Sequence, residues 1–153
     1  MPVDNRDTSL PPGEVYARIG RDGFARLVTN FYQQVAEDEL LRPMYPKGDL
    51  QPAARRLQMF LEQYFGGPDT YSQRRGHPRL RARHARFPID RAARERWMAL
   101  MRSALDDVDF PGEVRAAIEQ YLENAATFMI NRPPDEGGMF TTRYSPSDIT
   151  TEE

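Results

Sequence analysis

The sequence predicts a single all-α domain, and three observations support this prediction. Apolar residues recur at intervals of three and four in four segments, which is the spacing of an amphipathic helix. No segment alternates apolar and polar residues as a half-buried strand would. The length of 153 residues is typical of one domain. We expect the folded part to span residues 14–132, between a disordered leader at 1–13 and a mobile tail at 133–153.

The first long helix is predicted from residue 24 to residue 35. Its apolar face consists of Phe24, Leu27, Val28, Phe31, Tyr32 and Val35. Asp22 is the expected N-cap, because a short carboxylate side chain accepts hydrogen bonds from the first N–H groups of a helix. The second long helix is expected to begin near Pro52, since proline is favoured in the first turn, and to end at the glycine pair 66–67.

Two short pieces connect the second and third long helices. Residues 69–76 are predicted to form a loop. Pro78 can begin a short helix with His77 as its cap. Pro88 closes this stretch, because the residue before a proline is disfavoured in the helical region.

Two further long helices complete the predicted domain. Asp90 is the expected N-cap of the third helix. The apolar face of that helix is formed by Trp97, Leu100, Met101, Ala104, Leu105 and Val108. Pro111 opens the fourth helix. Its apolar face is formed by Val114, Ile118, Tyr121, Leu122, Ala125 and Met129.

The composition excludes several classes of function. There are 21 basic and 23 acidic residues, and a net charge of -2 argues against holding nucleic acid by bulk charge. The arginine-rich segment 74–87 could bind phosphates, but it has almost no interleaved aromatic residues for base stacking. With no cysteine there is no disulfide and no thiolate metal site. No apolar run approaches the ~20 residues that span a bilayer, so we expect a cytoplasmic protein without a membrane span.

His84 is the most informative single residue. On a helix its neighbours on the same face are Leu80 and Phe87, which are both apolar. A separate stripe of guanidinium groups is formed by Arg79, Arg83 and Arg86. The commoner structure for this pattern is a partly buried histidine that bonds to a backbone carbonyl. The alternative is an axial ligand of a haem iron, with Nε2 toward the iron and Nδ1–H donating to the Leu80 carbonyl. Arginines near the haem carboxylates would suit that alternative, because a planar guanidinium fits a carboxylate well.

His77 is a weaker candidate than His84. It precedes a proline, so it lies at a helix entrance or in a loop. A metal site shared by the two histidines is disfavoured, because every charge between them is an arginine and none is a carboxylate.

Three polar aromatic residues stand where large rings are expected to be buried. Tyr32 and Trp97 lie on apolar helix faces, and Tyr45 lies in a connector flanked by prolines. A buried Tyr or Trp needs a partner for its O–H or N–H. Ordinary core packing explains each one singly, whereas a shared internal polar site would explain all three.

Three blocks of the sequence resemble the group II (O-type) truncated haemoglobins. They are FYQQVAEDELLRPMYP, RLQMFLEQYFGGPDTYSQRRGHPRLRARHARFPI and RERWMALM. The RGHPRLRxRHAxF stretch, the GGPxTYS turn and the downstream tryptophan are together specific to that family. The resemblance covers residues 14–132 and implies a truncated globin fold, a two-over-two helical sandwich around haem b.

The resemblance also implies roles for individual residues. His84 matches the proximal iron ligand, and Trp97 matches the tryptophan whose indole N–H points at the bound ligand. Tyr32 and Tyr45 match two further distal positions, of which the second often holds Phe in globins. The other expected haem contacts are Ala53 at the distal gate, Arg56, Leu57, Phe60, Tyr71, His77, Leu80, Arg83, Phe87 and Met101.

The chain departs from the family pattern at two places. The glycine pair that often follows the first helix is represented by Gly20-Arg21, with Gly23 shortly after. Phe65 stands where close relatives often carry tryptophan, a conservative change that leaves the iron site untouched.

The function implied is a globin that binds O2, CO and NO with slow O2 release. A hydrogen bond to a charged acceptor is worth about 1.5–3 kcal/mol, so several donors around the ligand would hold it tightly. Such retention suits scavenging, sensing or redox detoxification. The alternatives are a haem-dependent nitric oxide dioxygenase or peroxidase served by a reductase, and a haem-free all-α interaction protein. A homodimer is compatible with each of these functions.

Overall fold

The computed structural model describes residues 10–132, and within that range the chain forms helices and turns without a β-strand. The long helices are α1 (Val15–Ala36), α2 (Gln51–Tyr64), α5 (Arg91–Val108) and α6 (Gly112–Met129). The short ones are η2 (Pro12–Glu14), η3 (Arg42–Met44), α3 (Thr70–Arg75) and α4 (Leu80–Arg83). The predicted tail and most of the predicted leader lie outside the described residues.

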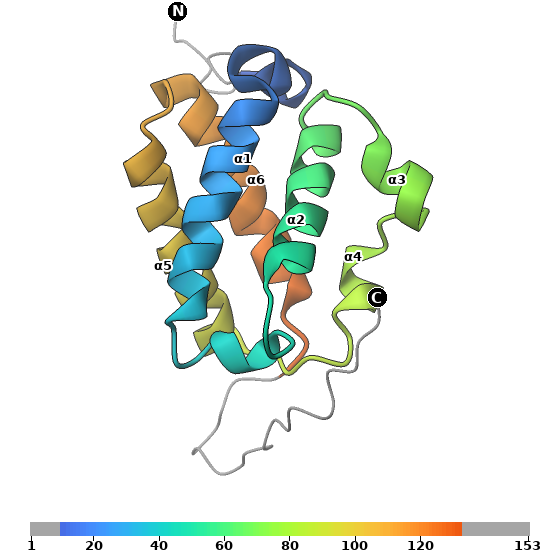
Figure 1. Cartoon of the computed structure of the whole chain (residues 1–153), viewed down its shortest axis with the longest axis vertical. Helices are drawn as coiled ribbons and strands as arrows, with labels where there is room; N and C mark the ends of the chain where they lie inside the picture. Colours follow the sequence, from blue (N-terminus) through green and yellow to red (C-terminus); the bar gives the residue numbers. More distant parts are fainter. Residues whose placement is uncertain (1–9, 133–153) are drawn as a thin grey trace, which may run out of the picture.

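The four long helices pack against one another mainly through α1 and α5. Helix α1 packs against α5 and α2, and α5 packs against α6. Figure 1 shows α1 and α2 side by side, with α6 behind them and the short helices α3 and α4 beyond α2. The core between the helices is apolar and includes the fully buried side chains of Phe24, Phe31, Leu61, Phe65, Met98, Met101, Leu105 and Ile118. No helix within residues 10–132 combines the length and apolar character needed to cross a membrane.

The predicted ends of the long helices are mostly confirmed. The Asp90 side chain caps α5, with Ala93 N donating to Asp90 Oδ1 at 2.9 Å. The prediction that Asp22 caps the first helix is wrong, because α1 already begins at Val15. The interruption in α1 lies at Gly20, whose φ of 64° and ψ of -174° are accessible essentially to glycine alone. The helix therefore resumes after Gly20 without a side-chain cap.

The connection between α2 and α5 differs from the prediction. Residues 70–75 form α3 instead of a loop, and Gln63 holds this helix by accepting from Ser72 N and donating to Ser72 Oγ, each at 2.9 Å. His77 does not cap the next helix, because α4 begins at Leu80 after Arg79, whose φ of 41° is left-handed. The chain thus turns sharply before α4.

The packed body also extends further toward the N-terminus than residue 14. Leu10 is buried in the core, and Pro12–Glu14 form a short 3-10 helix against α1. The backbone of Gly13 lies directly against Gly66, which has a φ of +100°. The start of the folded part is therefore held by the turn that ends α2.

Replacing Gly66 with alanine tests this contact. A Cβ at Gly66 would overlap the Gly13 carbonyl, whereas a Cβ at Gly20 would meet open space although φ is also positive there. We expect Gly66→Ala to lower the free energy of unfolding by about 2–5 kcal/mol, from a strained φ and a backbone clash together. Gly20→Ala should cost about 1–3 kcal/mol, from the strained backbone alone. Urea unfolding followed by circular dichroism measures both, and equal losses would contradict the clash.

Candidate functional site

A cavity of about 750 Å³ lies between α2, the α3–α4 segment, α5 and α6. The volume falls in the range of about 300–1,000 Å³ that is typical of cofactor and ligand sites. Most of the wall is apolar, as such sites require, and the apolar residues include Leu41, Met44, Leu61, Ile89, Leu122, Ala125 and Met129. These side chains come from segments far apart in the sequence.

Twelve of the fourteen site residues predicted from the sequence line this cavity. They are Tyr32, Tyr45, Ala53, Arg56, Leu57, Phe60, Tyr71, Leu80, Arg83, His84, Phe87 and Trp97. The other two do not. His77 is exposed, and its backbone carbonyl rather than its ring takes part in the site by accepting from Arg83. Met101 is fully buried in the core, one helical turn past the point where α5 borders the cavity.

His84 follows directly after α4 and presents a neutral imidazole to the cavity. Its Nδ1 lies 2.7 Å from the Leu80 carbonyl oxygen. Since a carbonyl only accepts, Nδ1 carries the proton and Nε2 keeps its lone pair. Burial lowers the pKa of His84, the bond to Leu80 opposes that effect, and the charge of Arg83 lowers the pKa further. This is the tautomer that a histidine ligand of a metal needs.

Asn131, which the sequence analysis did not single out, holds the segment that carries His84. Its Nδ2 donates to the carbonyl of His84 at 3.2 Å and to that of Phe87 at 3.0 Å. Its Oδ1 accepts from Ile89 N at 3.0 Å. Asn131 lies just beyond the last apolar position of α6, so the sequence pattern carried no signal for these long-range contacts.

Across the cavity, Tyr32, Tyr45 and Trp97 converge on one hydroxyl group. The Tyr45 side chain is hydrogen-bonded to both Tyr32 and Trp97, and the two phenol rings meet edge to face with centroids 5.6 Å apart. An indole N–H only donates, so Tyr45 Oη accepts from Trp97. The three polar aromatic residues that the sequence placed on buried faces therefore meet in one cavity.

The two phenols differ in how their mutual hydrogen bond affects them. Burial raises the pKa of both phenols. The hydrogen bond between them raises the pKa of Tyr32 further and lowers that of Tyr45. Either hydroxyl can donate to the other, because each carries one proton and two lone pairs.

Arg42 closes the loop that carries Tyr45. Its guanidinium donates to the carbonyl oxygens of Pro46 and Gly48, both at 2.9 Å. The Tyr45 carbonyl oxygen also lies 3.5 Å from Arg42 Nη1. The Arg42 side chain therefore holds three backbone carbonyls of this loop in place.

An ion pair between a buried carboxylate and a half-exposed guanidinium fixes the neighbouring corner to α5. Asp38 is 8% exposed and accepts from Arg96 Nη1 at 2.7 Å, while its other oxygen accepts from Leu41 N at 2.9 Å. Arg96 precedes Trp97 on α5. The ion pair therefore sets the distance between the turn after α1 and the helix that carries the indole donor.

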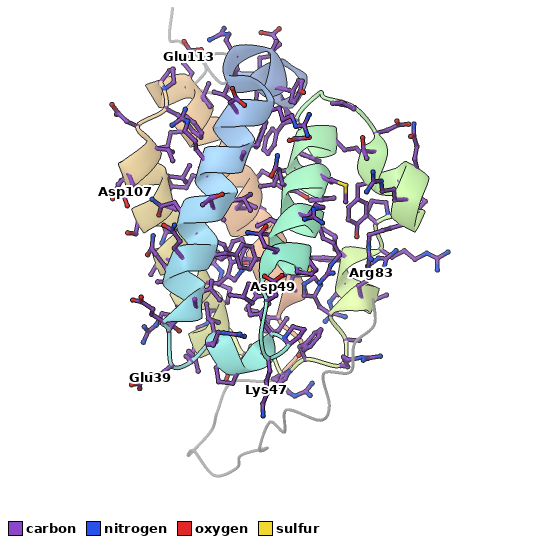
Figure 2. All side chains as sticks on the ribbon, viewed as in Figure 1. Glu39, Lys47, Asp49, Arg83, Asp107 and Glu113 are labelled. Carbon is purple, nitrogen blue, oxygen red and sulfur yellow. The ribbon has the colours of Figure 1, made fainter. Side chains whose placement is uncertain are left out.

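Arginine side chains gather at one edge of the cavity, although not as the predicted helical stripe. Arg79 is absent from the lining because of its left-handed backbone. Arg83 donates to the carbonyls of Arg75 and Pro78 at 2.7 and 2.8 Å, and Figure 2 shows it on the side of α3 and α4. Arg75 also lines the cavity, and its Nε is buried with no hydrogen-bond partner among the described residues. A ligand with an acidic edge would satisfy that donor.

The residues present fit a haem better than a metal held by side chains. Within residues 10–132 no three His, Cys, Asp or Glu side chains are grouped so that they could hold a metal ion. A metal at His84 therefore needs equatorial ligands from a prosthetic group, which a porphyrin supplies. The apolar wall and the arginines at the edge suit the ring and the carboxylates of a haem.

Comparison with known proteins agrees with this geometry. Residues 14–131 match the family described as bacterial-like globin. The chain is 41% identical over 121 residues to the group 2 truncated hemoglobin YjbI of Bacillus subtilis. The matched region covers 79% of this chain and 91% of that protein. It is 33% identical over 125 residues to the two-on-two hemoglobin-3 of Arabidopsis thaliana, and this match covers 80% of this chain and 71% of that protein. The chain therefore belongs to the bacterial-like globins.

Solved structures of relatives share the arrangement of helices. A thermostable hemoglobin from the actinobacterium Thermobifida fusca is 49% identical with a TM-score of 0.76, over 78% of this chain and 98% of that one. The truncated oxygen-avid haemoglobin of Bacillus subtilis is 42% identical with a TM-score of 0.74, over 76% of this chain and 98% of that one. The predicted two-over-two fold and the resemblance to group II truncated haemoglobins are thus confirmed.

Replacing each histidine with alanine tests whether His84 Nε2 is the nitrogen that binds the iron. We expect His84→Ala to lose stably bound haem, or to retain an iron that added imidazole rescues, because no other histidine lines the cavity within residues 10–132. His77→Ala is the matched control and should leave the axial ligand unchanged, since its side chain is exposed. Absorption spectra of the ferrous proteins decide, and a wild-type spectrum from His84→Ala without imidazole would refute the assignment.

Proposed function

We propose that this chain is a haem b globin that binds O2, CO and NO, with His84 as the axial ligand of the iron and with slow release of O2. One observation carries the proposal. A neutral imidazole with a bare Nε2 and a set of three bonded O–H and N–H groups line the same apolar cavity. The oxygen-avid character stated for the Bacillus subtilis relative supports tight O2 binding.

A bound haem supplies the iron and one open coordination position for a diatomic gas. The chain supplies the orientation of the ligand histidine. The Leu80 carbonyl holds Nδ1–H and Asn131 holds the backbone of residues 84–89, so the imidazole keeps one tautomer and one direction.

Tyr45 is the residue that we propose donates to the bound gas. Its oxygen accepts from Trp97. We propose that it also accepts from Tyr32, so that its own proton is available to an acceptor in the cavity. Burial raises the pKa of both phenols above the ordinary value, which keeps them protonated at neutral pH. A neutral phenol O–H is the state required of a donor.

The strength of this donation argues against rapid transport. A hydrogen bond to a charged acceptor is worth about 1.5–3 kcal/mol, or ~10–100-fold in the dissociation rate of O2 if it is fully expressed. Release that slow favours scavenging, sensing or redox detoxification. Nitric oxide dioxygenase and peroxidase activity remain the alternative within the globin class. The reductase, the homodimer and the cytoplasmic location expected from the sequence remain predictions.

Replacing Trp97 with phenylalanine separates donation from packing. Phenylalanine keeps most of the ring volume and removes the N–H that reaches Tyr45. Without the Trp97 N–H, the Tyr45 hydroxyl is no longer held in position toward the bound O2. We expect O2 to dissociate about tenfold faster or more, because the hydrogen bond to this charged acceptor is weakened or lost. Stopped-flow displacement of O2 by CO measures the rate. An unchanged rate would mean that Trp97 serves only to fill space.

Replacing the two tyrosines tests whether the donors act together. We expect Tyr45→Phe to raise the O2 dissociation rate more than Tyr32→Phe, because Tyr45 carries the free proton and Tyr32 acts through it. The double variant should depart from the product of the single effects, since groups in one hydrogen-bond network are not additive. The same stopped-flow experiment on all four proteins decides, and strictly multiplicative rates would show independent hydroxyls.

A further inference from the structure

A stacked pair of tyrosines connects the cavity with the protein surface. Tyr121 of α6 lines the cavity. Its ring stacks on Tyr64 of α2 with centroids 3.8 Å apart and an angle of 23° between the planes. Tyr64 is 41% exposed. Two oxidisable rings therefore form a continuous contact from the cavity wall to solvent, away from the donors at Tyr32, Tyr45 and Trp97.

The two phenols differ in their contact with water. Burial raises the pKa of Tyr121 to about 12, and the nearby Tyr64 contributes to that rise. A tyrosine that loses an electron also releases its phenolic proton, and at Tyr121 burial opposes that release. At the exposed ring of Tyr64 water can accept the proton. Oxidation that reaches the pair is therefore expected to settle on Tyr64.

Among the described residues, the other rings that Tyr121 contacts are phenylalanines. Tyr121 also contacts Phe65 and Phe60, with centroids 5.7 and 6.4 Å away. Phenylalanine has no phenolic proton to lose and is much harder to oxidise than tyrosine. The path through Tyr64 is both the closest contact and the one that ends in solvent.

We propose that Tyr121 and Tyr64 form a one-electron relay, through which a hydroperoxide reduced in the cavity oxidises small phenols at the surface of the protein. The relay rests on the proposed function, because it requires a haem in the cavity. Tyr64 is the residue at which the phenol substrate gives up its electron.

The electrons and protons of this reaction balance. Hydrogen peroxide takes up two electrons and two protons, its O–O bond breaks, and two water molecules form. For each electron, Tyr64 loses an electron to the cavity through Tyr121 and its O–H proton to water. A phenol then returns one hydrogen atom to Tyr64 and leaves as a phenoxyl radical. Two phenols are consumed for each peroxide.

Spin trapping on the haem-loaded protein tests the relay. Hydrogen peroxide is added without any phenol, in the presence of a nitrone or nitroso trap, and adducts are mapped to residues by mass spectrometry. We expect an adduct on Tyr64 in the wild type and the loss of most of it in Tyr121→Phe, where the stack is kept but the relay phenol is gone. No adduct on Tyr64 in the wild type would overturn the proposal, and so would an undiminished adduct in Tyr121→Phe.

Two controls separate the relay from simple exposure. Tyr16→Phe should leave the adduct on Tyr64 unchanged, because Tyr16 is half-buried, stacks on Phe24 and does not line the cavity. A one-electron oxidant generated photochemically in solution should label Tyr64 equally in the wild type and in Tyr121→Phe. Unequal labelling by that oxidant would mean that Tyr121 governs the exposure of Tyr64, which would also overturn the proposal.

Surface substitution gives a second, independent test. Tyr64→Phe should bind haem and O2 like the wild type while phenol oxidation by peroxide falls, since Tyr64 does not line the cavity. Unchanged phenol oxidation would refute the relay. Haem content and O2 binding are measured first in every variant. Their absence in the wild type would refute the proposed function, whereas their presence without a Tyr64 adduct refutes the relay alone.

Discussion

The Leu80 carbonyl accepts the Nδ1 proton of His84 at 2.7 Å, and the rest of the cavity is arranged around the nitrogen that this bond leaves bare. Burial keeps the imidazole neutral by lowering its pKa. Asn131 and Arg83 hold the backbone on either side of it, so a segment with few apolar contacts of its own is tied to α6 and α3.

The opposite wall depends on a second constraint, the position of the Tyr45 hydroxyl. Two polar side chains are hydrogen-bonded to it, and each is positioned from a different element, Tyr32 from α1 and Trp97 from α5. Arg42 fixes the loop of Tyr45, and the ion pair between Asp38 and Arg96 fixes the corner next to it. Because Asp38 is buried, removing Arg96 would leave its charge with only the backbone N–H donors of Leu40 and Leu41, which costs more than losing a surface pair. The supporting residues are therefore part of the site even though they do not face the cavity.

The fold and most of the site could be predicted because they depend on local patterns. Helix faces follow from apolar spacing, and Asp90 caps α5 through a contact three residues away. The errors have physical reasons. The sequence TYSQRR forms α3 without apolar spacing because Gln63 binds it from another helix. His77 was expected at the haem edge from the family resemblance; its ring is exposed and does not line the cavity, and its contact with haem stays a prediction. The roles of Asn131 and Arg42 rest on bonds to backbone carbonyls, which no pattern of side chains reveals.

The central claim is that this cavity holds a haem whose iron is bound by His84 on one side and is open on the other. The absorption spectrum of the purified ferrous protein, recorded with and without CO, tests it most directly. The account predicts a five-coordinate ferrous haem whose Soret band shifts and sharpens when CO binds. A protein without a Soret band, or one whose ferrous spectrum is already six-coordinate and unchanged by CO, would contradict it.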